Sequence, residues 1–163
     1  MILALDMAKA TGWAAGKPCG SPVYGTIRLD GSDAVRFIHL ARTVQRLIVE
    51  HDVTDVVLEA PFIGGKLQQS ALMPLFGYRA AAMIGAMAKG MEPTSAEASK
   101  VRKHFIGAGG LKRQAVKAAV IEKCRWRGWS PRNDNEADAL ALWDYRCAVL
   151  DPQHLVLSFK RGA

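Results

Sequence analysis

The sequence predicts an α/β fold: a mixed five-stranded sheet, built from an antiparallel meander followed by parallel strands, with helices flanking it. Short, continuous apolar runs at residues 2–5 and 56–58 are typical of buried strands. Between them, apolar and polar residues alternate over 23–29, and apolar residues then recur at helical spacing over 35–48. Strands and helices that follow one another in this way favour a sheet covered by helices.

Three strands at 2–6, 11–15 and 23–29 are expected to form the meander, because turn residues fill the segment 16–22. The later elements are expected, in order, as a helix to about residue 51, a strand at 55–59, a helix at 69–89, a strand at 92–97 and helices at 99–106, 112–127 and 135–150. The apolar helix at 69–89 could form a contact between subunits or belong to the core of the domain.

Length and composition fit a single domain over residues 1–163, since 50% hydrophobic residues can form a substantial core. No apolar run is long enough to span a bilayer, and the N-terminal run lacks the features of a signal peptide. We therefore expect a cytoplasmic protein with no membrane partner. The three cysteines form no C-x-x-C pair and the four histidines show no zinc-ligand spacing, so reduced thiols are expected.

The chain is basic, with 22 lysines and arginines against 15 acidic residues and a formal net charge of +7. Positive charge of this size favours binding to polyanions, although it says nothing about the fold. Nucleic acid is the polyanion that we favour over a membrane surface, because no basic amphipathic segment stands out.

Three carboxylates lie where buried elements end or begin. Asp6 and Glu59 each end an apolar strand, and Asp138 lies near the start of the final helix. A carboxylate at the end of a buried strand is costly to desolvate unless it meets a cation or a hydrogen-bond donor. Convergent carboxylates are the usual ligands of the paired Mg²⁺ ions that catalyse phosphodiester hydrolysis. The alternatives are a turn carboxylate for Asp6, a salt bridge for Glu59 and a helix-dipole interaction for Asp138.

Four short segments carry a resemblance to a known family. They are Leu3-Ala4-Leu5-Asp6 with Thr11-Gly12-Trp13, Val57-Leu58-Glu59-Ala60-Pro61-Phe62, Val101-Arg102-Lys103 with the following glycine loop and Lys112-Arg113, and Asn135-Glu136-Ala137-Asp138-Ala139-Leu140-Ala141. In this order the chain resembles the RuvC-like Holliday junction resolvases, especially the small phage-type members, within the ribonuclease H-like superfamily.

The resemblance implies a homodimeric endonuclease that nicks two strands of a four-way DNA junction with Mg²⁺, for which Mn²⁺ would substitute. It implies Asp6 as the ligand that bridges two metal ions, with Glu59 and Asp138 each holding one. Phe62, in the loop after Glu59, would enter the junction, with packing in the core or at a dimer contact as the alternatives, and Lys66 in the same loop would contact a phosphate. The residues expected to bind the DNA backbone flank the glycine loop: Arg102, Lys103, Lys112 and Arg113.

The fourth metal ligand stays open at this point. The family often has an acid three residues before the final Asp, and Asn135 stands there. Residues four apart on a helix lie about 40° apart around its axis, so Asp134 shares the face of Asp138 if the helix begins early enough. Glu136 would point roughly away from Asp138, and the Asn133-x-x-Glu136 spacing favours a structural role in a helix cap. Asp134, Asn135 or a shifted Glu136 could therefore supply the fourth ligand.

Two other functions fit the same residues. A less specific nuclease would cut flaps, branched DNA or RNA–DNA hybrids, since the fold alone does not select the substrate. A non-catalytic protein that binds branched DNA would fit if the site lacks its fourth ligand. Cleavage of a four-way junction, compared with duplex, flap and hybrid substrates, separates these hypotheses.

Overall fold

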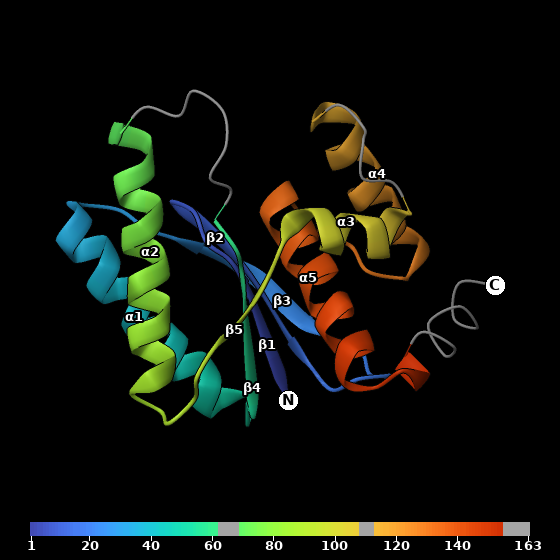
Figure 1. Cartoon of the computed structure of the whole chain (residues 1–163), viewed down its shortest axis with the longest axis horizontal. Helices are drawn as coiled ribbons and strands as arrows, with labels where there is room; N and C mark the ends of the chain where they lie inside the picture. The colour runs from blue at the N-terminus through green and yellow to red at the C-terminus, as the bar shows by residue number, and fades with distance from the viewer. Residues whose placement is uncertain (62–68, 108–112, 155–163) are drawn as a thin grey trace.

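The structure is a computed structural model that describes residues 1–61, 69–107 and 113–154 (Figure 1). Five strands form one sheet in the order β3-β2-β1-β4-β5. The strands are β1 (Ile2–Asp6), β2 (Ala10–Gly16), β3 (Val23–Arg28), β4 (Asp55–Glu59) and β5 (Thr94–Ala96). The first three pair antiparallel, and β1–β4 and β4–β5 pair parallel, which confirms the predicted meander and the mixed sheet.

Helices cover both faces of the sheet (Figure 1). They are α1 (Asp33–Glu50), α2 (Gln69–Met87), α3 (Ala98–Ile106), α4 (Arg113–Trp126) and α5 (Asp134–Leu150). The α1–α2 pair packs on one face, and α5, backed by α3 and α4, packs on the other. Within the described residues, no helix is long and apolar enough to cross a membrane.

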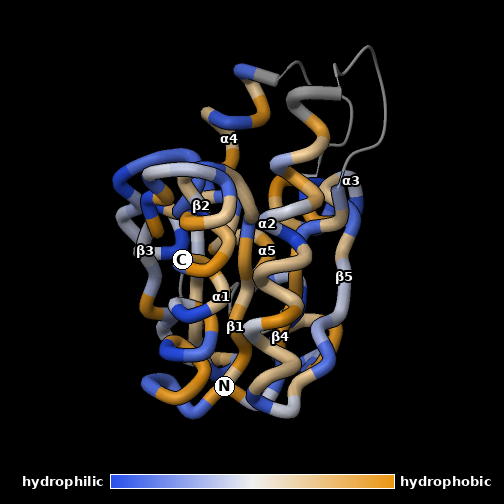
Figure 2. The backbone as a smooth tube through the Cα atoms, turned by 90° about the vertical axis from the view of Figure 1, so that its left-hand side faces the viewer, coloured by the Kyte–Doolittle hydropathy of each residue, from blue (hydrophilic) through white to orange (hydrophobic). Residues whose placement is uncertain are grey.

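The central strands β1 and β4 contain continuous hydrophobic runs, at residues 2–5 and 56–58 (Figure 2). Leu3 and Leu5 pack toward α1 and α2, whereas Ile2 and Ala4 pack toward α5. Because side chains alternate between the faces of a strand, Asp6 follows Ile2 and Ala4 onto the α5 face. A strand that is buried on both faces is what a parallel sheet between two helix layers requires.

Helices α1 and α2 pack closely against each other because two glycines of α2 face α1. A Cβ atom at Gly77 would lie 2.0 Å from Cζ of Phe37, and one at Gly85 would lie 2.5 Å from the carbonyl oxygen of Ala41. The absence of these side chains lets the two helix backbones approach, so the inner face of α2 belongs to the core of the domain.

A buried ion network ties α5 to its neighbours. The Asp144 carboxylate is fully buried, and its oxygens lie 2.9 Å from Nε2 of His104 and 2.9 Å from Nε2 of His154. Arg127 donates a third hydrogen bond, at 3.2 Å. Nδ1 of His154 accepts a hydrogen bond from the Cys19 backbone N–H at 2.8 Å, so Nε2 is the nitrogen that donates to Asp144.

Loss of the Asp144 charge is expected to destabilise the protein in a pH-dependent way. Burial raises the pKa of Asp144, but hydrogen bonds from His104 and His154 and the charge of Arg127 outweigh burial and lower the pKa to about 2. A depressed pKa contributes stability above the unfolded-state value near 4, and this contribution, about 2 kcal/mol, is lost as the pH falls from about 4 to 2. Urea unfolding of Asp144→Asn should show a lower free energy of unfolding at pH 7, by about 3 kcal/mol.

Urea unfolding repeated between pH 4 and 2 should show a smaller fall in the free energy of unfolding for Asp144→Asn than for the wild type. An unchanged acid dependence in the variant would show that other carboxylates control acid unfolding.

Candidate active site

Asp6 and Glu59 are brought side by side by the register of β1 and β4. Leu5 pairs with Leu58 in this parallel pair, so the next residues, Asp6 and Glu59, follow at neighbouring strand ends. Glu59 is on the α5 face, like Asp6, because it follows Val57 at a spacing of two residues. The hydrophobic runs that end in these acids therefore place both carboxylates at one edge of the sheet, beneath α5.

The turn after Asp6 is fixed by Thr11, which is fully buried at the start of β2. Its hydroxyl donates a hydrogen bond to the carbonyl oxygen of Ala8 at 2.7 Å and accepts one from the Ala8 N–H at 3.3 Å. This contact holds the three-residue turn between β1 and β2, and thereby the end of the strand that carries Asp6.

The first turn of α5 lies directly on β2 because position 12 is a glycine. A Cβ atom there would lie 1.9 Å from the carbonyl oxygen of Asn135 and 2.5 Å from its carbonyl carbon. Gly12 pairs with Asp6 in the β1–β2 ladder. The glycine therefore allows the helix start to approach the strand end, and brings Asp134 and Asp138 toward Asp6.

Helix α5 begins at Asp134, so Asp134 and Asp138 share one helix face as the sequence allowed. The N-cap is Asn133, whose Oδ1 accepts a hydrogen bond from the Glu136 N–H at 3.0 Å. Asp134 forms an ion pair with Lys117 of α4.

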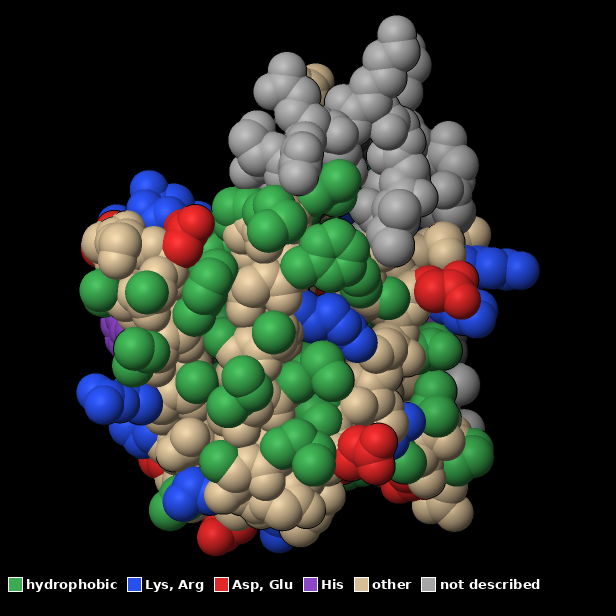
Figure 3. Space-filling view, turned by 60° about the vertical axis from the view of Figure 1, so that its left-hand side comes forward, with side chains coloured by type: hydrophobic (Ala, Val, Ile, Leu, Met, Phe, Trp, Pro, Cys, Tyr) green, Lys and Arg blue, Asp and Glu red, His purple; other side chains and the backbone are tan. Residues whose placement is uncertain are grey.

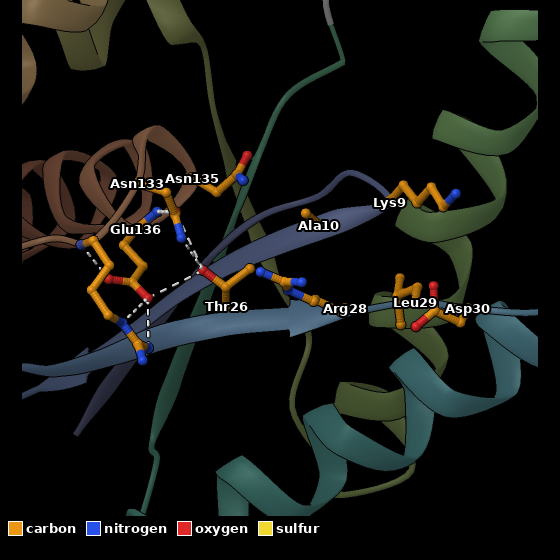
Figure 4. A pocket seen from close by; sticks show the side chains of 10 residues that line it. Lys9, Ala10, Thr26, Arg28, Leu29, Asp30, Asn133, Asn135 and Glu136 are labelled. Carbon is orange, nitrogen blue, oxygen red and sulfur yellow. Dashed lines mark hydrogen bonds and ion pairs between the residues drawn. The ribbon is translucent and has the colours of Figure 1, made fainter.

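Glu136 has a structural role at this helix start (Figure 4). Its side chain is fully buried, and Oε2 accepts a hydrogen bond from the Arg132 N–H at 2.8 Å. Oε1 accepts hydrogen bonds from the Arg132 guanidinium at 2.8 and 3.1 Å and from the Thr26 hydroxyl at 3.2 Å. Because these partners already occupy both oxygens, the structure supports the predicted structural role and leaves Asp134 and Asn135 as the alternatives for a fourth ligand.

Electrostatics identify the carboxylates that are close together. Burial raises the pKa of Asp6 well above its usual value, and the charges of Glu59, Asp138 and Asp134 raise it further. Burial and the charge of Asp138 raise the pKa of Glu59 to about 7. Arg102 of α3 lowers the pKa of both Asp6 and Glu59. Mutual repulsion of this kind is relieved when a cation binds between the carboxylates.

The raised pKa of Glu59 predicts that the metal-free protein becomes less stable as the pH rises. A carboxyl group whose folded-state pKa exceeds its unfolded value contributes stability below about pH 4.5, and this contribution is lost as the pH rises through 7. The shift corresponds to at most about 3 kcal/mol. Urea unfolding in EDTA should show that the free energy of unfolding falls less between pH 4.5 and 8 for Glu59→Gln than for the wild type. Mg²⁺ should stabilise the wild type at pH 8.

If the free energy of unfolding in EDTA fell equally with pH for the wild type and Glu59→Gln, this electrostatic account of Glu59 would be contradicted. A control at an exposed carboxylate of α1, Glu50→Gln, should keep the wild-type slope.

The donor set suits a hard divalent cation, because all four predicted ligands supply carboxylate oxygens. Within the ranges that the structure describes, no group of three or more acidic, histidine or cysteine side chains is already arranged to hold a metal ion. Asp134 also faces Lys117. The chemistry of the donor set therefore fits a divalent metal ion.

A cavity of about 240 Å³ opens beside Asp6 and Glu59. Arg79 of α2 lines it and donates a hydrogen bond to the backbone carbonyl of Glu59 at 3.2 Å, and its guanidinium also binds the Ser95 hydroxyl. Arg79 thus connects α2 to the ends of β4 and β5. Arg79 is not among the predicted site residues. It is the single charged residue between 69 and 87, and a lone cation in an apolar helix is the signal that could have identified it.

The structure places some of the predicted DNA-binding residues. Arg102 lies near the carboxylates, as its effect on their pKa values requires, and Lys103 is exposed on the same helix. Arg113 is the first residue of α4. The predictions for Phe62, Lys66 and Lys112 concern positions outside the described residues.

The chain is similar to known proteins over most of its length. The family model described as crossover junction endodeoxyribonuclease RuvC matches residues 13–143. The protein of that name from Salinispora arenicola is 29% identical, over 78% of this chain and 72% of the relative. Its namesake from Pseudomonas aeruginosa is 25% identical, over 99% of this chain and 96% of the relative.

A solved structure shows the same fold. Thermus thermophilus RuvC, in complex with Holliday junction substrate, has a TM-score of 0.65 and 17% sequence identity, over 86% of this chain and 88% of that one. The predicted ribonuclease H-like fold is thereby confirmed. Because the family model covers most of the chain, from β2 to the middle of α5, this protein belongs to the RuvC family of crossover junction endodeoxyribonucleases.

Proposed function

We propose that this chain is a metal-dependent, structure-selective endodeoxyribonuclease that resolves four-way DNA junctions by paired nicks. The observation that supports the proposal most strongly is that Asp6 and Glu59 end neighbouring strands beneath the first turns of α5, which carry Asp134 and Asp138, in a chain of the RuvC family. The junction-bound relative supports the choice of substrate. We further propose that one domain over residues 1–163 carries the activity and that it acts in the cytoplasm.

Mg²⁺ is the proposed metal, with Mn²⁺ as a substitute. When bound, two such ions would supply an activated water molecule and charge stabilisation at the leaving oxygen. Asp6 would contact both ions, and Glu59 and Asp138 would hold one each. Asp134 is the proposed fourth ligand, released from Lys117, because α5 begins early enough to place it on the face of Asp138.

The basic residues would position the DNA rather than read its sequence, because contacts to phosphate carry no direct sequence information. Arg102 and Lys103 on α3, with Lys112 and Arg113 at the start of α4, are the proposed backbone contacts. Phe62 and Lys66 are proposed to contact the junction, since they follow Glu59 within a few residues in the chain.

A homodimer is the proposed assembly, and the outer face of α2 is its proposed interface. An apolar stripe on this helix, the α2 stripe, is exposed and consists of Met73, Phe76, Ala80, Met83 and Met87. Its members are alternately three and four residues apart, which is the spacing of a seam between paired helices. Figure 3 views this side of the molecule, where hydrophobic side chains gather. A two-fold axis would give two active sites, in keeping with paired nicks.

Charges in the α2 stripe are expected to separate the subunits. The double variant Met83→Glu/Met87→Glu should raise the dimer dissociation constant by at least about 100-fold, because two carboxylates would be desolvated in an apolar contact. Sedimentation equilibrium measures this change, and circular dichroism checks the fold. Val149→Glu, at an exposed apolar position of α5, should leave the dimer intact. A double variant as dimeric as the wild type would exclude α2 as the interface.

The proposed function is tested by cleavage of a labelled four-way junction beside matched linear duplex, flap and RNA–DNA hybrid substrates, with Mg²⁺ and with EDTA. We expect symmetric paired nicks in the junction that disappear in EDTA. Equal cutting of flap or hybrid substrates would favour the less specific nuclease. Tight junction binding without cleavage in Mg²⁺ or Mn²⁺ would favour a non-catalytic branch-binding protein, the hypothesis that Asn135 leaves open.

A further inference from the structure

A second cleft, of about 730 Å³, lies beside the start of α5 and apart from the cavity at Asp6 and Glu59. Three segments that are distant in the sequence form it: the β1–β2 turn, the end of β3, and the residues around the α5 N-cap (Figure 4). The polar side chains that matter for its chemistry are Lys9, Arg28, Asp30, Arg132, Asn135 and Glu136.

Two cations of this cleft are available for a ligand. Lys9 and Arg28 are exposed, and in the part of the chain that the structure describes neither side chain has a hydrogen-bond or ion-pair partner. Arg132 differs from them, because its guanidinium is held by the buried Glu136. Glu136 neutralises Arg132, and Asp30 offsets one of the two remaining cations. The charged residues that line the cleft therefore carry an excess of one positive charge.

Hydrogen bonds hold the floor of the cleft together. Thr26 of β3 binds both Asn133 and Glu136, with its hydroxyl 3.1 Å from Nδ2 of Asn133 and 3.2 Å from Oε1 of Glu136. These contacts join the sheet edge to the start of α5. A ligand in the cleft would therefore be positioned relative to the helix that carries Asp134 and Asp138.

The cleft and α3 flank the carboxylates on opposite sides. Lys9 precedes β2 and Arg28 ends β3, whereas α3 follows β5, and the sheet order places β1 and β4 between them. Arg102 of α3 acts on the carboxylates from the other side. A DNA strand whose scissile phosphate meets the carboxylates must continue past them, and its neighbouring phosphates are repelled there unless cations lie alongside.

We propose that this cleft binds a backbone phosphate of the cleaved strand, next to the scissile phosphate, through Lys9 and Arg28. The proposal rests on the proposed nuclease function and adds a second contact region to it. Backbone contacts of this kind fix the register of the strand on the enzyme. Lys9 and Arg28 thus decide which phosphate reaches the carboxylates, and Arg102 and Lys103 hold the strand on the far side.

The test compares the double variant Lys9→Ala/Arg28→Ala with Arg42→Ala/Arg46→Ala, which removes the same charge from exposed positions of α1 on the opposite layer. Binding to a four-way junction is measured in EDTA over a range of salt concentrations. The cleft variant should bind about tenfold more weakly, and the slope of log affinity against log salt should fall by nearly 2, as expected for two lost phosphate contacts. The α1 variant should change affinity by less than about twofold.

A second measurement locates the phosphate. Single methylphosphonate substitutions, which remove one phosphate charge, are placed in turn along the cleaved strand. The wild type should lose affinity at one or two positions beside the nick, and the cleft variant should be insensitive at those positions. Equal affinities of the two double variants, or unchanged sensitivity in the cleft variant, would overturn the proposal. A wild type that neither binds nor nicks the junction would instead refute the proposed function, and melting temperatures confirm that both variants fold.

Discussion

Replacing Asp6 with asparagine is expected to reduce junction cleavage by at least about 10³-fold, or about 4 kcal/mol of transition-state stabilisation. The amide keeps the size of the side chain but removes the negative charge that would hold a cation between β1, β4 and α5. Burial and the charges of Glu59, Asp138 and Asp134 all raise the pKa of Asp6, so this carboxylate lies among the negative charges that a cation would neutralise.

The same substitution should raise the melting temperature in EDTA, because burial and carboxylate repulsion make a charged Asp6 unfavourable without a metal. The rate of single-turnover cleavage should therefore fall while the melting temperature in EDTA rises. Junction binding should be retained, which separates this loss from a binding defect. Asp52→Asn, at an exposed turn residue, is the matched control and should change neither quantity. Cleavage by Asp6→Asn within tenfold of the wild type would show that Asp6 is not a metal ligand.

Gly12→Ala is expected to destabilise the protein by about 3 kcal/mol and to reduce cleavage by about 100-fold. The added methyl group would overlap the carbonyl of Asn135, so the start of α5 must move away from β2. A displacement of about 1 Å in catalytic groups is enough to lower a rate by about two orders of magnitude. The melting temperature should fall by roughly 6–12 °C for a chain of this size.

Gly90→Ala provides the comparison for this variant. Gly90 has a positive φ of 73° and no neighbour within 4 Å of an added Cβ atom, so the alanine meets backbone strain but no packing clash. We expect a cost of about 1 kcal/mol and unchanged cleavage. If Gly12→Ala matched Gly90→Ala in both stability and cleavage, the close approach of α5 to β2 would have no role in arranging the site.

Where the candidate site residues lie in the fold could largely be predicted, because the relevant signals are local. The apolar runs before Asp6 and Glu59 identify both residues as strand ends, and alternation along a strand decides which face each side chain takes. The spacing of Asp134 and Asp138 depends only on helical periodicity and on where the helix begins. For α2, the sequence left open a contact between subunits or a place in the core of the domain. Its inner face packs on α1, and its outer face is exposed and apolar.

Other features depend on contacts that no local pattern encodes. The hydrogen bond from Arg79 to the Glu59 carbonyl joins elements 20 residues apart, and Thr26 binds Glu136 across 110 residues. Asp134 meets Lys117 only because α4 packs against α5. Each of these pairings is set by how helices and sheet dock, which depends on the packing of whole surfaces.

The sequence by itself determined the strands, the helices, the basic character and the carboxylates, because hydrophobic periodicity and charge are properties of short segments. Only the tertiary structure decided that Glu136 is structural, that α5 begins close enough to place Asp134 beside Asp138, and that Lys9 and Arg28 share a cleft next to them. The physical reason is that these relations join segments distant in the chain, which meet only when α5 packs on the sheet, as it does at Gly12.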